Sequence, residues 1–215
     1  MKKNIIIVLS LLVFMSFFSC ATLQNNQQQG TAVGAGVGAG VGAILGQAIG
    51  RDTESTLIGA GIGAALGGIA GNQIGRYMDL QEQELRNAVA ASEAASIRRE
   101  QDILRATFKG EAFFGFNSTE LKPGGYAELK RVAEVLNKYP QTIIEIGGHT
   151  DIKGTEEYNQ TLSLKRAEAV KSVLIQNGVI PERMNTVGYG ESRPISSDHA
   201  MNRRVEIIIV PIRQG

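Results

Sequence analysis

The stretch Gly147–Ala167, which reads GGHTDIKGTEEYNQTLSLKRA, decides the fold and the candidate site of this chain. A strand-like run, Thr142–Ile146, precedes it, and the stretch itself enters a helix-like run, Glu156–Gln176. In a strand–helix unit, the carboxyl end of the strand and the first turns of the helix line one crevice, where open α/β sheets bind ligands. We therefore expect polar side chains of this stretch to line a binding site.

Three of these side chains suit a zwitterionic ligand. Asp151 follows the predicted strand, whereas Asn159 and Arg166 lie seven residues apart in the predicted helix, so both project from one helix face. A guanidinium group binds a carboxylate through two parallel hydrogen bonds, and an aspartate accepts hydrogen bonds from an ammonium group. The three residues would fit the amino-acid-like end of a ligand. An internal salt bridge between Asp151 and Arg166 is an equally good interpretation of the spacing alone.

Several motifs together resemble the OmpA-like peptidoglycan-binding domain. GHTD and LSLKRA are followed by GYGE, a proline and NRRVEI, and the resemblance covers Ala112–Val210. It implies that the ligand is the diaminopimelate residue of the peptidoglycan stem peptide, with its ammonium group on Asp151 and its carboxylate on Arg166. It also implies further contacts from Phe116, Asn117, Thr150, Asn159, Leu162 and Arg203. Many family members carry Asp where this chain has Asn117, which offers no charge to an ammonium group.

The pattern of apolar residues predicts an α+β domain over residues 109–212, which agrees with the fold of that family. The predicted order is βαβαββ, with a mixed sheet and helices on one face. The predicted strands are Ala112–Phe116, Thr142–Ile146, Arg183–Val187 and Arg203–Val210. The predicted helices are Pro123–Tyr139 and Glu156–Gln176.

The N-terminus has the pattern of a secretory signal. Residues 1–19 have two lysines and then an apolar run that is too short for an ordinary transmembrane span. The ending Phe17-Phe18-Ser19-Cys20 resembles the lipobox of bacterial lipoproteins, which implies that Cys20 is lipidated, although Phe17 stands where Leu is usual. An ordinary secretory signal with an incidental cysteine is the alternative. Residues 20–30 would form the lipidated cysteine and a flexible Gln/Asn-rich tether.

A strict glycine repeat fills residues 31–76. Glycine recurs at every fourth position from Gly34 to Gly50 and again from Gly59 to Gly75, a spacing typical of closely packed membrane helices. This segment resembles the glycine-zipper hairpin of bacterial envelope lipoproteins. A disordered glycine-rich linker is the alternative, and a nucleotide-binding loop fits worse because no strand precedes it. Residues 77–108, rich in Glu, Gln, Arg and Ala, predict a solvated connecting helix with a thin apolar face.

Composition argues against several other functions. The chain has 22 basic and 21 acidic residues, so a nucleic-acid partner is not expected. Its single cysteine allows neither an internal disulfide nor a cysteine-based zinc site. We expect no cofactor, no metal and no enzymatic activity, because neither a metal triad nor an activated nucleophile is recognisable. His149 is expected to hydrogen-bond to the backbone rather than to act as a base or metal ligand.

The sequence therefore predicts a lipoprotein of a Gram-negative cell envelope that tethers a membrane to the cell wall. Its partners would be peptidoglycan, membrane lipid through Cys20 and the glycine hairpin, and possible further copies of itself. Ala21 favours the outer membrane over the inner one, with the C-terminal domain in the periplasm. The alternative is that the glycine hairpin forms a membrane-embedded oligomer, a pore or an assembly factor, and that the OmpA-like domain serves only as its wall anchor.

Overall fold

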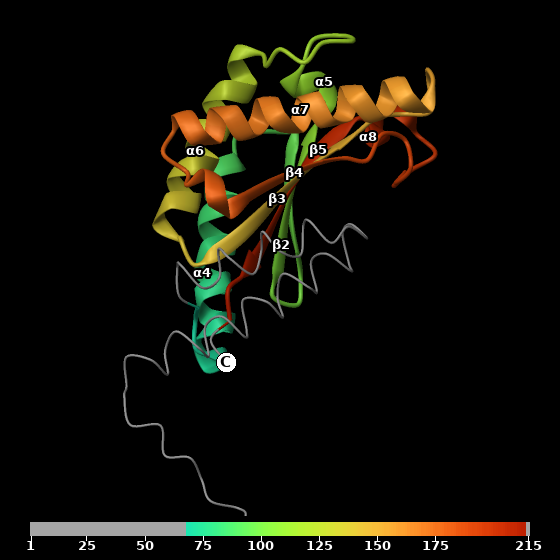
Figure 1. Cartoon of the computed structure of the whole chain (residues 1–215). Coiled ribbons are helices and arrows are strands. Elements are labelled where there is room, and N and C mark those ends of the chain that lie inside the picture. Colours follow the sequence, from blue (N-terminus) through green and yellow to red (C-terminus); the bar gives the residue numbers. More distant parts are fainter. Residues whose placement is uncertain (1–67, 214–215) are drawn as a thin grey trace, which may run out of the picture. The chain divides into compact units, whose positions relative to one another are not determined.

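The computed structural model describes residues 68–213 (Figure 1). The predicted signal segment, Cys20, the tether and most of the predicted glycine hairpin lie outside these residues. The described elements are α4 (Gly71–Val89), β1 (Ala95–Glu100), β2 (Ile103–Lys109), α5 (Gly110–Phe113), α6 (Pro123–Lys138), β3 (Thr142–His149), α7 (Glu156–Gln176), the 3-10 helix η2 (Pro181–Arg183), β4 (Met184–Gly188), α8 (His199–Asn202) and β5 (Arg204–Pro211).

The strands form one mixed sheet in the order β1-β2-β5-β3-β4. Only β3 and β4 are parallel, and α7 connects them, whereas the other neighbouring strands are antiparallel. All residues of β3 and β5 are buried, as expected for the central strands of a covered sheet. The predicted α+β class with a mixed sheet is therefore confirmed.

The helices α6 and α7 pack against one face of the sheet, as predicted, and α4 packs on the same face. Their apolar side chains share one core with alternate residues of the strands, including Leu104, Ile144 and Ile207. The opposite face carries a second, smaller cluster that contains Ile143, Tyr189, Ile208, Val210 and Ile212. In Figure 1, α7 runs across the strands on the helical side of the sheet.

The prediction of a solvated connecting helix over residues 77–108 is wrong. The helix α4 ends at Val89, and it buries Ile74, Met78, Leu85 and Val89 in the main core. Burial of each such side chain stabilises the fold by roughly 1.5–3 kcal/mol. The helix is therefore part of the domain. On its exposed side, Glu82 and Arg86, which lie four residues apart, form an ion pair with a separation of 2.7 Å.

The second half of the same segment forms the hairpin β1–β2. Its residues Leu104, Ala106 and Phe108 alternate with more exposed residues, and all three face the main core. The tight turn between the strands contains Gln101, whose φ of 55° lies in the left-handed region. The sheet therefore has five strands instead of the predicted four, and the domain begins well before residue 109.

The predicted first strand, Ala112–Phe116, is also wrong. Residues Gly110–Phe113 form the short helix α5, and only Phe114 makes an isolated bridge, to Leu121. Phe113 and Phe114 are both buried, which an alternating strand on a one-sided sheet does not permit. The Phe113 ring packs at 4.8 Å from that of Phe108.

The other predicted elements are found with small shifts. The predicted helix Glu156–Gln176 coincides with α7, where the Thr155 side chain accepts a hydrogen bond from the amide of Tyr158 as an N-cap. The strand predicted at Thr142–Ile146 extends to His149, and the last two strands each begin one residue later than predicted. Along residues 68–213, none of the helices combines the length and the apolar character that a membrane crossing requires.

Candidate functional site

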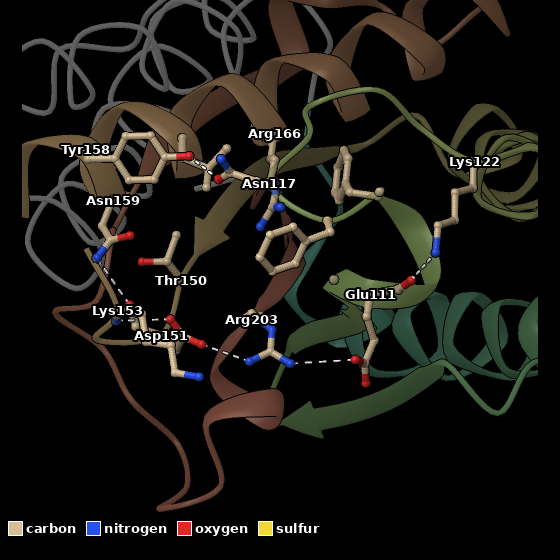
Figure 2. A pocket seen from close by; sticks show the side chains of 15 residues that line it. Glu111, Asn117, Lys122, Thr150, Asp151, Lys153, Tyr158, Asn159, Arg166 and Arg203 are labelled. Carbon is tan, nitrogen blue, oxygen red and sulfur yellow. Dashed lines mark hydrogen bonds and ion pairs between the residues drawn. The ribbon is translucent and has the colours of Figure 1, made fainter. Parts of the chain in front are cut away.

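A cavity with a volume of about 460 Å³ opens at the carboxyl end of β3 (Figure 2). We call it the pocket. All eight contact residues predicted from the sequence line it: Phe116, Asn117, Thr150, Asp151, Asn159, Leu162, Arg166 and Arg203. The remaining lining residues were not predicted: Gly110, Glu111, Phe114, Gly115, Lys122, Lys153 and Tyr158. The expected convergence of Asp151, Asn159 and Arg166 on one space is thus present in the structure.

Two glycines hold α7 close to the strand ends that carry the pocket. A Cβ atom at Gly148 would overlap the main-chain carbonyl of Ser163, and one at Gly188 would come within 2.8 Å of the Gln160 carbonyl oxygen. Main-chain atoms cannot move aside as a flexible side chain can. These glycines therefore let the helix that carries Asn159 and Arg166 lie directly against the strands.

Asp151 pairs with Arg203 and not with Arg166. Its Oδ2 accepts a hydrogen bond of 2.8 Å from Arg203 Nη1, and its Oδ1 accepts one of 3.1 Å from the amide of Lys153. Burial raises the pKa of Asp151, but the hydrogen bonds from Arg203 and Lys153 together outweigh burial, and the net pKa lies below its ordinary value. The carboxylate is therefore ionised at neutral pH. The alternative of an Asp151–Arg166 salt bridge is wrong.

Arg166 reaches the pocket with much of its hydrogen-bonding capacity unused. The residue is only 6% exposed, its Nε donates to the Ser118 carbonyl oxygen at 3.0 Å, and its guanidinium lies 5.1 Å from the centre of the Phe114 ring. Within the described part of the chain, its two Nη atoms have no hydrogen-bond partner. Burial lowers the pKa of Arg166, yet an arginine stays charged under all ordinary conditions. A buried, partly unpaired guanidinium is a strong carboxylate receptor.

The rim of the pocket combines amide and aromatic groups. Tyr158 of α7 donates a hydrogen bond to the side-chain oxygen of Asn117, whose φ of 52° is one that asparagine tolerates well. Asn159 donates to the Asp151 carbonyl oxygen at 3.2 Å and to Glu191 at 2.5 Å. Phe116 is fully exposed beside the opening. Asn117 is thus held by the protein itself, which limits what it can offer to a ligand.

The expectation for His149 is wrong. Its ring is 2% exposed, and within residues 68–213 neither ring nitrogen has a hydrogen-bond partner. The ring stacks on that of Tyr189 with a centroid separation of 5.0 Å. Burial, and after it the neighbouring Arg204, lowers the pKa of His149 to about 3. It is a neutral packing residue on the sheet face opposite the helices.

Comparison with known proteins assigns the domain to a class. Residues 113–207 match the model of the OmpA family, and residues 1–75 match that of the YMGG-like Gly-zipper. The chain therefore contains an OmpA-like domain preceded by a glycine-zipper sequence, as its motifs predicted.

The relatives include two lipoproteins. The probable lipoprotein YiaD of Escherichia coli is 38% identical over 63% of this chain and 64% of its own length. The peptidoglycan-associated lipoprotein of Pseudomonas aeruginosa is 39% identical over 44% of this chain and 59% of its own length. The chain thus spans less than two thirds of these relatives.

A solved structure shares the arrangement of the domain. The cell wall anchor of the T6SS from Pseudomonas aeruginosa superposes with a TM-score of 0.53 at 25% identity, over 60% of this chain and 99% of that one.

Proposed function

We propose that this protein binds peptidoglycan non-covalently through the pocket and thereby links the cell wall to other parts of the cell envelope. The ligand is a zwitterionic residue of the stem peptide, of the diaminopimelate type. Asp151 receives its ammonium group and Arg166 its carboxylate, with Thr150, Asn159 and Leu162 beside them. The observation that carries the proposal is the buried guanidinium of Arg166, whose Nη atoms are unpaired within residues 68–213, in one cavity with an ionised aspartate.

The relatives support this proposal and its cellular setting. One is named for association with peptidoglycan and another for anchoring to the cell wall, and neither name denotes an enzyme. We further propose that lipidated Cys20 and the glycine-zipper segment attach the chain to a membrane, most simply the outer membrane, with the domain in the periplasm. Both relatives described above are lipoproteins by name, which supports this attachment.

Co-sedimentation of the full-length protein, purified in mild detergent, with peptidoglycan sacculi tests the binding. The variants Asp151→Asn and Arg166→Met each remove one charge of the pocket, and each should raise the dissociation constant for sacculi at least tenfold, since a charge-assisted hydrogen bond contributes about 1.5–3 kcal/mol. Asp79→Asn and Arg86→Met change an acid and a base on α4 and serve as matched controls.

Circular dichroism must show that every variant is folded. Free meso-diaminopimelate should release the bound parent protein, whereas pimelate, which lacks the amino groups, should release far less. If the parent stays in solution, or if both pocket variants sediment as well as the controls, the proposed binding site is wrong.

A further inference from the structure

Arg203 lies between two carboxylates on one side of the pocket. Its Nη1 contacts Asp151 at 2.8 Å, and its Nη2 lies 3.5 Å from Oε2 of Glu111 (Figure 2). We call Asp151, Arg203 and Glu111 the ion triad. Asp151 is nearly buried at the inner end of this triad, with 9% of its side chain exposed, whereas the Glu111 side chain is 63% exposed at the outer end.

The main chain fixes Glu111 in this place. The amide of the preceding Gly110 donates a hydrogen bond of 2.8 Å to the carbonyl oxygen of Arg203. A Cβ atom at Gly110 would lie 2.8 Å from the same oxygen, so only glycine allows this close approach. Lys122 donates to the main-chain oxygen of Glu111 at 2.6 Å, so the Glu111 carboxylate pairs with Arg203 and not with Lys122. The first turn of α5 is therefore held against Arg203, with the Glu111 side chain turned towards the guanidinium.

The charges of the triad decide what it can attract. Asp151 and Arg203 alone form a pair without net charge, and such a pair has little electrostatic preference for an ammonium group over a neutral one. With Glu111, two carboxylates share one guanidinium, and the triad carries one net negative charge. Arg166, Lys122 and Lys153 bring only positive charge to the pocket lining. The lining as a whole has two acids and four bases, so negative charge is confined to the side of the pocket that holds the triad, and the net charge of that triad depends on Glu111.

We infer that Glu111 is a specificity-determining residue that gives the ion triad its net negative charge, by which this side of the pocket selects a ligand with a free ammonium group. This inference rests on the proposed function, because it concerns the ammonium half of the same site. The ligand class that it defines is an amino acid or peptide end with a free amino group beside a carboxylate. Glu111 acts through space on the ammonium group that Asp151 contacts.

The test measures selectivity in addition to binding. Full-length protein bound to sacculi is released with meso-diaminopimelate or with pimelate, and the ratio of the two inhibition constants reports the preference for ammonium. Glu111→Gln should lower this ratio by about three- to tenfold, as expected for the loss of one partly screened charge near the ligand. Glu134→Gln, an exposed acid on α6, is the matched control and should leave the ratio unchanged.

A double variant separates charge from positioning. In Glu111→Gln/Arg203→Met, Asp151 alone again carries one net negative charge, and the ratio should return to within about twofold of the parent value. If Glu111 served only to position Arg203, the double variant would be no better than Glu111→Gln. That outcome, or an unchanged ratio in Glu111→Gln, overturns the inference.

The proposed function is judged separately in the same experiment. If the parent binds sacculi and Asp151→Asn does not, the binding site stands whatever the result for Glu111. If the parent does not bind sacculi at all, the proposed function fails, and the selectivity inference fails with it.

Discussion

The neutral, buried His149 should make the domain lose stability in mildly acidic solution. Its pKa is about 3 in the folded protein, against an ordinary value of 6.5. Because the folded-state pKa is depressed, the unfolded chain binds the proton more readily between these two values. The stability that the domain has with a neutral His149 is therefore fully present above about pH 6.5, and it is lost progressively as the pH falls towards 3.

The magnitude follows from the two pKa values. Each pKa unit corresponds to about 1.4 kcal/mol, so His149 should lower the free energy of unfolding by about 2 kcal/mol at pH 5 and about 3 kcal/mol at pH 4, relative to pH 8. In His149→Phe, an aromatic ring that cannot titrate replaces the imidazole over Tyr189. This part of the acid sensitivity should disappear in the variant.

Urea denaturation of parent and variant between pH 4 and pH 8 measures the effect. Carboxyl groups also affect stability at the acidic end of this range, among them that of Glu206, whose Oε2 lies 3.9 Å from His149 Nε2. The difference between the two pH profiles removes most of their contribution. His149→Gln serves as a second non-titrating variant, since it should flatten the profile equally although it loses the ring stacking. Parallel profiles for parent and both variants would refute the reasoning.

Four further predictions concern the packing that supports the pocket. Leu85→Ala should lower the free energy of unfolding by about 2–5 kcal/mol because it leaves a cavity between α4 and the core, and urea denaturation would show an unchanged stability if this is wrong. A fragment that starts at residue 109 should not fold, since it lacks β1 and β2, and the circular dichroism spectrum of a folded domain would contradict this. Gly148→Ala should push α7 away from β3, cost about 1–3 kcal/mol and weaken sacculus binding, whereas Gly124→Ala, which has open space around it, should do neither. Arg183→Met should lower the free energy of unfolding by about 3 kcal/mol or more, because the buried guanidinium donates to the carbonyl oxygens of Leu136, Tyr139 and Thr142. A melting temperature equal to that of the parent would contradict this role.

The part of the fold that could be predicted is the part with strong local patterns. The helix α7 has an N-cap threonine and a clear end at Asn177-Gly178, and its bounds were predicted correctly. The helix α4 was predicted to be solvated because most of its residues are charged or carry amides. Its buried apolar residues are few and form one narrow stripe: Ile74, Met78, Leu85 and Val89. The β1–β2 hairpin was missed because its turn contains no Gly or Pro and relies on Gln101 instead.

The sequence predicted eight residues that line the pocket, but it did not predict which side chains form ion pairs there. The motifs brought Asp151, Asn159 and Arg166 together because all three belong to one strand–helix unit. The partner of Asp151 is Arg203, 52 residues further along the chain, and this contact depends on the antiparallel pairing of β3 with β5. Glu111 was missed because it directly precedes Ala112–Phe116, which was predicted as a strand, whereas Gly110–Phe113 forms the helix α5.

The position of Ile69 sets the direction in which a pulling force would load the domain. Its amide donates to the Ile212 carbonyl oxygen at 2.7 Å, just beyond the carboxyl end of β5, whereas the pocket lies at the amino end of the same strand. The eight residues of β5 separate these points by about 26 Å. A pull between residue 69 and a ligand in the pocket would thus act along the strands, across hydrogen bonds that run perpendicular to them. In this shear geometry many bonds share the load at once, and the central strands would resist extension far better than if they were peeled apart one bond at a time.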